Sequence, residues 1–78
     1  MKTYIFRIGM EQEEDGRWSA DVPTLPGCAT WGYSKEEALR SIQEAVRLYV
    51  ESLVAHGETV PLGAPVEVLE EPAVAITL

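Results

Sequence analysis

The most reactive side chains in the sequence are its single cysteine, Cys28, and its single histidine, His56. A thiol attacks as the thiolate, which a neighbouring histidine can generate. His56, however, falls at the far end of a predicted helix, in a partly exposed place where its cationic form would interact favourably with the helix dipole. A free cysteine without a base usually packs as a small apolar residue. We therefore predict a buried structural thiol and no catalytic pair.

The carboxylates offer a second possible chemistry, metal-dependent hydrolysis of nucleic acid. That reaction needs several carboxylates from different strands to hold two cations about 4 Å apart. Asp21 is the one acid placed within a predicted strand, and Glu11, Glu13, Glu14 and Asp15 form a charged run typical of a solvated turn. The glycines have no phosphate-binding spacing, and no serine has a candidate base. We predict no catalytic residue, no metal site and no cofactor, with a residual nuclease that uses Asp21 as the least favoured alternative.

Charge and length limit the remaining classes of protein. The chain has 78 residues with thirteen acidic and six basic side chains, a net charge of -7, and residues 58–78 contain four acids and no base. An acidic chain is a poor direct ligand for nucleic acid, and its natural complement is a basic partner protein. No apolar run approaches the roughly 18 residues that would span a bilayer. We expect a single soluble domain.

The N-terminal residues lack a secretory signal, because the short alternating segment after Lys2 runs into the acidic cluster. One cysteine cannot form an internal disulfide, which fits a reducing compartment. The predicted location is the cytoplasm.

The first part of the chain predicts an antiparallel meander of three strands. Residues 2–10 and 17–22 alternate apolar and polar side chains, and Asp15-Gly16 between them is a strong hairpin signal. Phe6 and Trp18 are expected on the face toward the helix, whereas Arg7 and Asp21 are expected on the solvent side. The two prolines of residues 23–27 make a stiff connector, and residues 28–32 form the third strand.

A long helix is predicted next. Ser34 and Glu37 form a capping box, in which each side chain bonds to the other residue's amide, and Gly57 is the expected end. Glu36 with Arg40 and Arg47 with Glu51 are opposite charges four residues apart on the wet side. The apolar residues recur at three- and four-residue steps and form one stripe: Ala38, Leu39, Ile42, Ala45, Val46, Tyr49, Val50, Leu53 and Val54. Leu48 lies outside this stripe, on a flank of small residues.

The C-terminal part predicts a connector and a final strand. Residues 57–65 are rich in glycine and proline, residues 66–70 are either a short strand or an extended crossover, and residues 73–78 form a fourth strand. The fold class is therefore α+β, a three-stranded antiparallel meander followed by one long helix and a final strand, in the order β-β-β-α-β.

A core this small is the main reason to expect self-association. Below about 70 to 80 residues a single core rarely supplies more than roughly 3 to 5 kcal/mol, and here neither a disulfide nor a metal is available to add to it. One helix can cover only one face of the sheet. The other face is expected to carry Ile5, Ala29, Trp31, Tyr33, Ala73 and Ala75. We predict a homo-oligomer, a dimer or tetramer, with the uncovered face or a strand edge as the contact; the alternative is a monomer with a few exposed aromatics.

Several motifs in a fixed order give the sequence a family resemblance. They are Asp15-Gly16, then residues 20–28 with the pattern Val-Pro-x-Leu-Pro-Gly-Cys, then the capped Ser-Lys-Glu-Glu-Ala-Leu of residues 34–39, then residues 45–49, then residues 57–61. The chain resembles the HicB-like antitoxin family through residues 4–61. The resemblance implies a partial RNase H-like fold without the active-site carboxylates. The signature residues Pro23, Leu25, Pro26, Gly27 and Cys28 are interpreted first as structural, the alternative being a loop that also touches a partner.

The resemblance also implies a function by protein–protein contact. Such a protein binds and neutralises a small basic HicA-like toxin that cleaves mRNA and has a double-stranded-RNA-binding type of fold. Many family members continue into a DNA-binding domain, whereas this chain ends at Leu78. We expect residues 1–78 to be a single HicB-like domain without its own DNA-binding domain, so that autoregulation would need another protein. The second hypothesis is a solitary oligomeric ligand-binding or regulatory scaffold that has no toxin.

Overall fold

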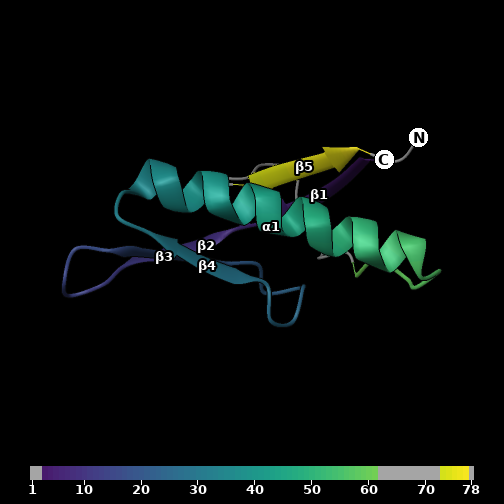
Figure 1. The fold of residues 1–78 in the computed structure, drawn as a ribbon, viewed down its shortest axis with the longest axis horizontal. Helices are drawn as coiled ribbons and strands as arrows, with labels where there is room; N and C mark the ends of the chain where they lie inside the picture. The colour runs from purple at the N-terminus through teal and green to yellow at the C-terminus, as the bar shows by residue number, and fades with distance from the viewer. Residues whose placement is uncertain (1–2, 62–72, 78) are drawn as a thin grey trace.

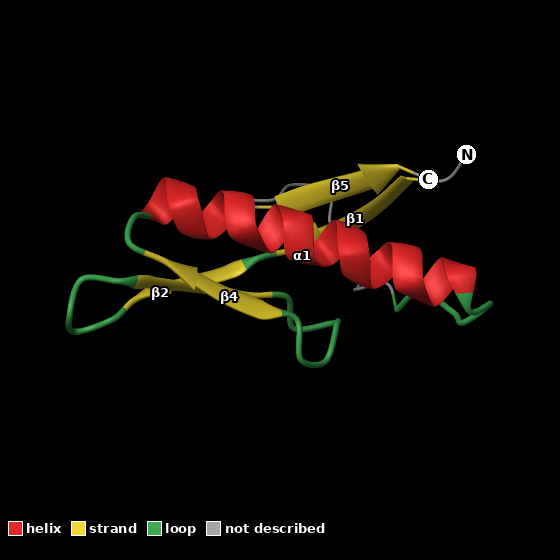
Figure 2. Ribbon diagram, in the orientation of Figure 1, coloured by secondary structure: helices red, strands yellow, loops and turns green. Residues whose placement is uncertain are grey.

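The computed structural model describes residues 3–61 and 73–77, and in this part of the chain one helix lies across antiparallel strands (Figures 1 and 2). The elements are β1 Thr3–Arg7, β2 Gly9–Gln12, β3 Trp18–Asp21, β4 Ala29–Gly32, α1 Lys35–Ala55 and β5 Ala73–Thr77. The expected α+β class, with a meander, one helix and a final strand, is confirmed. The suggested strand at residues 66–70 lies outside the described residues.

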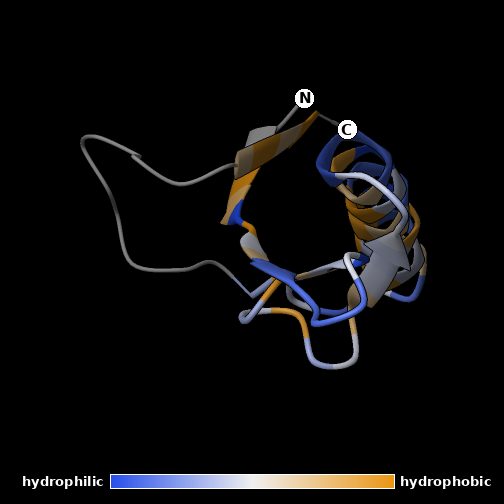
Figure 3. Ribbon diagram, turned by 90° about the vertical axis from the view of Figure 1, so that its left-hand side faces the viewer, coloured by the Kyte–Doolittle hydropathy of each residue, from blue (hydrophilic) through white to orange (hydrophobic). Residues whose placement is uncertain are grey.

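The first strand differs from its prediction because it is divided in two at Ile8. β1 pairs with β5 in antiparallel register from Thr3 opposite Thr77, whereas β2 pairs with β3 from Gly9 opposite Asp21. Ile8 itself is only 1% exposed and joins neither ladder. The end-on view shows the strands curving beside the helix rather than forming a flat layer (Figure 3). The break lets the two halves of this strand follow that curve with different partners.

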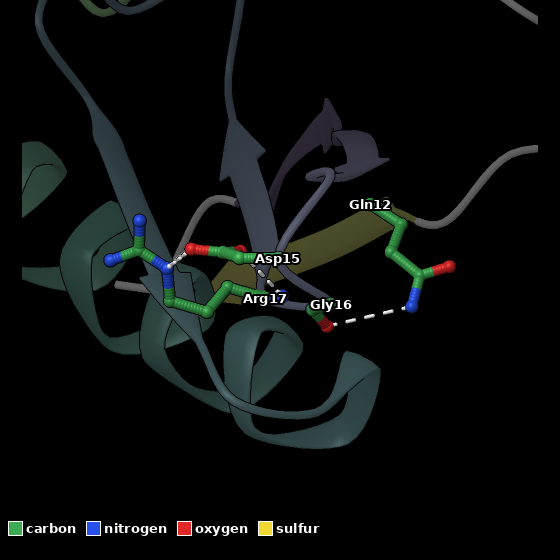
Figure 4. Close-up of polar contacts among 4 residues, drawn as sticks. All are labelled: Gln12, Asp15, Gly16 and Arg17. Atoms are coloured by element: carbon green, nitrogen blue, oxygen red, sulfur yellow. Dashed lines mark hydrogen bonds and ion pairs between the residues drawn. The ribbon is translucent and has the colours of Figure 1, made fainter.

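The meander of β2, β3 and β4 follows the predicted order. Its hairpin closes where Asp15-Gly16 was expected, with the Glu13 amide donating to the Arg17 carbonyl at 2.7 Å and Gly16 at φ +91°. Figure 4 shows the Asp15 carboxylate accepting from both the backbone amide and Nε of Arg17, at 3.0 and 2.7 Å. The Gln12 side chain donates to the Gly16 carbonyl at 3.4 Å. The turn is therefore held by its own side chains.

Helix α1 begins and ends at the residues that the local pattern indicates. The Ser34 hydroxyl oxygen accepts from the Glu37 amide at 3.1 Å. At the other end Gly57 has φ +69°, its amide donates to Val54, and the Glu58 amide donates to Leu53. This pair of bonds is the Schellman arrangement, which satisfies the last carbonyls of a helix. Among the described residues no helix is long and apolar enough to cross a membrane.

The core forms where the inner face of the strands meets the buried side of α1. Its residues come from β1, β3 and β5, from Ile8 between β1 and β2, from the connector between β3 and β4, and from four helix positions. They are Phe6, Ile8, Ala20, Val22, Leu25, Cys28, Ala38, Ile42, Val46, Val50, Val74 and Ile76. Val54, expected in the apolar stripe, is instead 48% exposed. The last helical turns extend past the labelled strands in Figure 1, so none of the described strands covers this end of the helix.

Candidate protein-binding surface

The strands form two sheets, β1 with β5 and β2 with β3 and β4, and each has exposed apolar residues on the face turned away from α1, which we call together the outer face. Ile5, Trp31 and Tyr33 are 56%, 51% and 72% exposed. Ala29 of β4 and Ala75 of β5 are exposed as well. These are five of the six residues that the alternation placed away from the helix, and the sixth, Ala73, is half-buried. Large apolar side chains exposed on one face of a small domain mark an interaction surface more often than scattered single residues do.

An ordered cluster of three side chains occupies the β4 end of this face. The Trp31 and Tyr33 rings pack edge to face with centroids 5.1 Å apart. The Arg17 guanidinium lies 5.2 Å from the Trp31 ring centroid, within the range of a cation–π contact. Oδ2 of Asp15 lies 2.7 Å from Nε of the same guanidinium. We call Arg17, Trp31 and Tyr33 the aromatic cluster.

The sequence positions this cluster through the alternation of β4. Trp31 and Tyr33 flank Gly32, whose buried face points at the first turn of α1, so the two rings must point outward. Ser19 of β3 lies opposite Trp31, and Glu11 of β2 lies opposite Ser19. A small residue therefore separates Trp31 from Glu11 along one row of the outer face, which leaves the Trp31 ring open to solvent.

Acidic side chains stand next to the aromatic cluster. Residues 11–17 carry four acids, all exposed, and one base, a net charge of -3. The pKa of the Asp15 carboxyl is lowered, first by the hydrogen bond from the Arg17 amide and further by its guanidinium, against an opposing effect of desolvation. The carboxylate thus stays charged and fixed to Arg17. The candidate surface therefore combines the aromatic cluster with the exposed carboxylates of residues 11–15 next to it.

The five signature residues form a tight connector from β3 to β4. Leu25 is 1% exposed, its amide donates to Val22, and the Cys28 amide donates to Leu25, each at 3.0 Å. Pro23, Pro26 and Gly27 are exposed, and Gly27 has φ +79°, a conformation that favours glycine. The Tyr49 hydroxyl donates to the Pro26 carbonyl at 2.9 Å. The connector is therefore anchored to the core by Leu25 and Cys28, while its prolines face solvent.

The candidate chemical residues are not brought together. Cys28 is 6% exposed, and burial, followed by the negative charge of Asp21, raises the pKa of its thiol, which keeps it neutral. His56 is the C-cap residue of α1, with Nδ1 2.7 Å from the Ser52 carbonyl oxygen. Asp21 is exposed, and the described residues contain no group of three or more His, Cys, Asp and Glu side chains placed to hold a metal ion.

A groove between α1 and β5 was not anticipated. Its volume is about 470 Å³, and its helical wall is Arg40, Gln43, Glu44 and Arg47. The i, i+3, i+4, i+7 spacing of these residues was visible in the sequence, but nothing local indicated that β5 would lie beside them.

The ion pairs expected within the helix, Glu36 with Arg40 and Arg47 with Glu51, are wrong. Among the described residues, the one ion pair with N and O atoms within 4.0 Å joins Asp15 and Arg17.

Comparison with known proteins gives a family and a fold. The family described as HicB-like antitoxin of bacterial toxin–antitoxin systems matches residues 6–74. A UPF0150 protein of Thermoplasma acidophilum is 46% identical over 56 residues, 72% of this chain and 81% of that protein. A UPF0150 protein of Synechocystis is 43% identical over 58 residues, 74% of this chain and 73% of that protein.

Among solved structures, the N-terminal domain of the Burkholderia pseudomallei antitoxin HicB superposes with a TM-score of 0.70. The match covers 95% of this chain and 96% of that domain at 23% sequence identity, so it establishes the shared fold.

Proposed function

The chain belongs to the HicB-like antitoxin family, and from that premise we propose that it binds a small basic HicA-like toxin and masks the surface with which the toxin cleaves mRNA. The site is the aromatic cluster together with the acidic residues 11–15. Antitoxin action requires contact and no catalysis by this chain, which agrees with the neutral, buried Cys28 thiol.

The observation that carries the proposal is an exposed, preorganised Arg–Trp–Tyr cluster. Trp, Tyr and Arg are the residues most enriched among the few that dominate the affinity of an interface. Here the Asp15 salt bridge, the cation–π contact and the edge-to-face packing already hold the three side chains. These contacts favour one arrangement of the three side chains, which reduces the side-chain entropy that binding would cost.

Charge complementarity supports a basic partner in particular. Acidic residues 11–15 extend along the hairpin beside the cluster, within a chain whose net charge is -7. Opposite potentials speed encounter and disfavour wrong partners, and this effect weakens as salt rises. A toxin that cleaves RNA needs a cationic surface, and an acidic antitoxin is the natural competitor for it.

We extend the proposal to the remaining properties of the chain. Residues 1–78 act as one HicB-like domain of partial RNase H-like type, without an enzyme activity or a DNA-binding function of their own, and they act in the cytoplasm, where the toxin would meet mRNA.

The second candidate function is a homo-oligomeric ligand-binding or regulatory scaffold without a toxin. It is favoured by the apolar outer face, because Ile5, Trp31 and Tyr33 could equally be covered by other copies. The two functions differ in whether a basic chain binds this protein at all.

The test is co-expression with the product of the neighbouring reading frame, chosen as a short, strongly basic chain with a prominent histidine. We expect the two chains to co-purify and this protein to suppress both growth arrest and RNA cleavage by the basic chain. Trp31→Ala should weaken binding by at least about 30-fold, the equivalent of a 2 kcal/mol hot spot. The association rate should fall as salt is raised.

Leu48→Ala is the matched control. Leu48 is an apolar side chain that is 59% exposed, comparable with Trp31, but it lies on α1 and not on the outer face of the sheet. The affinity of the Leu48→Ala variant for the basic chain should equal that of the wild type. If both variants lose the same affinity, or if Trp31→Ala keeps full affinity, the toxin binds elsewhere on this protein. If the basic chain neither binds this protein nor is neutralised by it, the scaffold function is favoured.

A further inference from the structure

Strand β5 has a bare edge. Among residues 3–61 and 73–77 it pairs only with β1, so no described strand takes up the backbone groups of its other edge (Figure 1). Sheet proteins usually protect such an edge with a lysine, a proline, a bulge or a cover. β5 reads Ala-Val-Ala-Ile-Thr and carries neither lysine nor proline. Its backbone is therefore able to pair with an added strand.

The groove between β5 and α1 lies beside this edge. Its strand wall is residues 73–76, and β5 runs lengthwise along the first half of α1 (Figure 1). Its helical wall consists of four exposed polar side chains, Arg40, Gln43, Glu44 and Arg47. Neighbouring strands stand about 4.8 Å apart, so a strand added to β5 would enter the groove and lie next to these side chains.

The charge of the groove is opposite to that of the rest of the molecule. Two arginines and one glutamate line it, a net charge of +1, whereas the whole chain has a net charge of -7. The hairpin residues 11–17 have a net charge of -3. An acidic segment is repelled by most of this protein and attracted to the groove, which favours binding at this one place.

We propose that the groove binds an extended segment of a partner protein by strand addition to β5, and that this segment carries carboxylates at positions i and i+4. Backbone hydrogen bonds to an exposed sheet edge supply affinity in this mode of recognition, and side chains at alternate positions supply specificity. Here the alternate side chains would face α1. Their stems would cover Val74 and Ile76, the apolar part of the groove lining, while their charged ends reach the helix.

The spacing of the arginines selects the spacing of the carboxylates. Arg40 and Arg47 are separated by two helical turns, about 10.5 Å along the axis. Residues i and i+4 of a strand are about 13 Å apart, and residues i and i+2 about 6.6 Å. The wider spacing is the closer match, and the long arginine side chains absorb the difference. Residue i+2 then faces Gln43 and Glu44, where a lysine pairs with the carboxylate.

Other occupants fit the groove less well. Nucleic acid phosphates could meet the two arginines, but Glu44 stands between them, and a nucleic acid has no amide groups to pair with the bare edge. A second β5 has the amide groups but no charged side chain for the helical wall. The inference does not depend on the proposed function, because the groove lies apart from the aromatic cluster on β4 and the hairpin, and no toxin enters the test.

The experiment measures binding of a fluorescein-labelled peptide, Thr-Glu-Val-Lys-Val-Glu-Thr, to the full chain by fluorescence anisotropy. The peptide should bind saturably, and the charge-reversed peptide Thr-Lys-Val-Glu-Val-Lys-Thr should bind at least about tenfold more weakly. Arg40→Gln and Arg47→Gln should each raise the peptide Kd by about two- to fivefold, the range for an exposed ion pair. The double variant should raise it by roughly tenfold.

Two controls separate the groove from general charge attraction. Arg7→Gln removes the same charge from an exposed arginine of β1 that does not line the groove, and it should leave the Kd unchanged. The triple variant Arg40→Glu, Glu44→Arg, Arg47→Glu inverts the charged wall and should prefer the charge-reversed peptide. Circular dichroism should show that every variant is folded.

Backbone methylation of the peptide tests strand addition itself. Successive amides of a strand point to opposite edges, so the two valines share one edge and the two glutamates and the lysine share the other. A peptide N-methylated on one of these sets should lose binding, and a peptide methylated on the other set should keep it. Equal binding by both methylated peptides overturns strand addition.

Three further results would overturn the proposal. The first is a wild type that does not bind the peptide at millimolar concentration. The second is an Arg7→Gln variant that weakens binding as much as Arg40→Gln and Arg47→Gln, because attraction is then not specific to the groove. The third is a short RNA that displaces the peptide from the wild type but binds the double variant poorly, which would assign the two arginines to phosphates.

Discussion

Replacing Gly32 with alanine tests how closely the meander and the helix are packed. A Cβ at this position would lie 2.6 Å from the Ala38 amide nitrogen and 3.1 Å from the Ala38 Cα. Ordinary contact begins at 3.4 Å, so the nearest approach is about 0.8 Å too short. The atoms it meets belong to the backbone of the first helical turn, which cannot rotate away as a side chain can. Either β4 or the start of α1 must move.

The cost follows from what such a movement disturbs. Overpacking a well-packed interior costs typically about 1 to 3 kcal/mol, and rigid backbone neighbours place Gly32→Ala at the upper part of that range. A core of this size supplies roughly 3 to 5 kcal/mol, so the variant should lose about half of its stability or more. The melting temperature should fall by roughly 10 to 20 °C. The displaced strand also carries Trp31 and Tyr33, so affinity for a basic partner should fall with it.

Gly9→Ala is the matched control, measured by urea denaturation followed by circular dichroism. Its Cβ would lie 2.5 Å from Oδ1 of Asp21, which is the end of an exposed side chain that can turn aside. The cost should stay below about 0.5 to 1 kcal/mol, within the usual range for surface changes. If Gly32→Ala unfolds at the same urea concentration as Gly9→Ala, the close packing of β4 against α1 described above is wrong.

Two further predictions concern the helix start and the thiol. Ser34→Ala removes the acceptor of the Glu37 amide and should cost about 0.5 to 2 kcal/mol; an unchanged urea midpoint would show that the cap contributes nothing. The Cys28 thiol should react with iodoacetamide far more slowly in the native protein than in urea, because burial raises its pKa and limits access. Since the folded pKa lies above the ordinary value of 9.0, this group's contribution to stability is complete below pH 9.0 and is lost as pH rises through the folded pKa. Cys28→Ser should flatten that alkaline decline, and rapid native alkylation at neutral pH would contradict the buried, neutral thiol.

Much of the fold was predictable because its signals are local. The turn at Asp15-Gly16, the Ser34 cap and the Gly57 end each depend on residues within a few positions of one another. The alternation that placed Trp31 and Tyr33 outward is also local, because successive side chains of a strand point to opposite faces. The same reasoning gave the boundaries to within a residue or two, as with Cys28, which precedes β4 instead of beginning it.

The candidate site was only partly predictable. Exposure of the aromatic residues followed from the alternation, but the stacking of Arg17 on Trp31 depends on β3 and β4 lying side by side in one register. The intrahelical pairs expected of Arg40 and Arg47 failed because surface ion pairs four residues apart are weak and compete with solvation. Spacing alone therefore identified which residues share a face, but not which of them touch.

By itself the sequence determined the α+β class, the extent of the long helix, the inner and outer faces of the strands, and the acidic character of the chain. Only the tertiary structure decided that the first strand divides at Ile8, that β5 lies against β1 with a bare edge, and that a groove separates this edge from Arg40 and Arg47. The physical reason is the range of the interactions involved. Caps, turns and alternation are set by neighbours along the chain, whereas strand order and grooves are set by which distant segments together bury the most apolar surface.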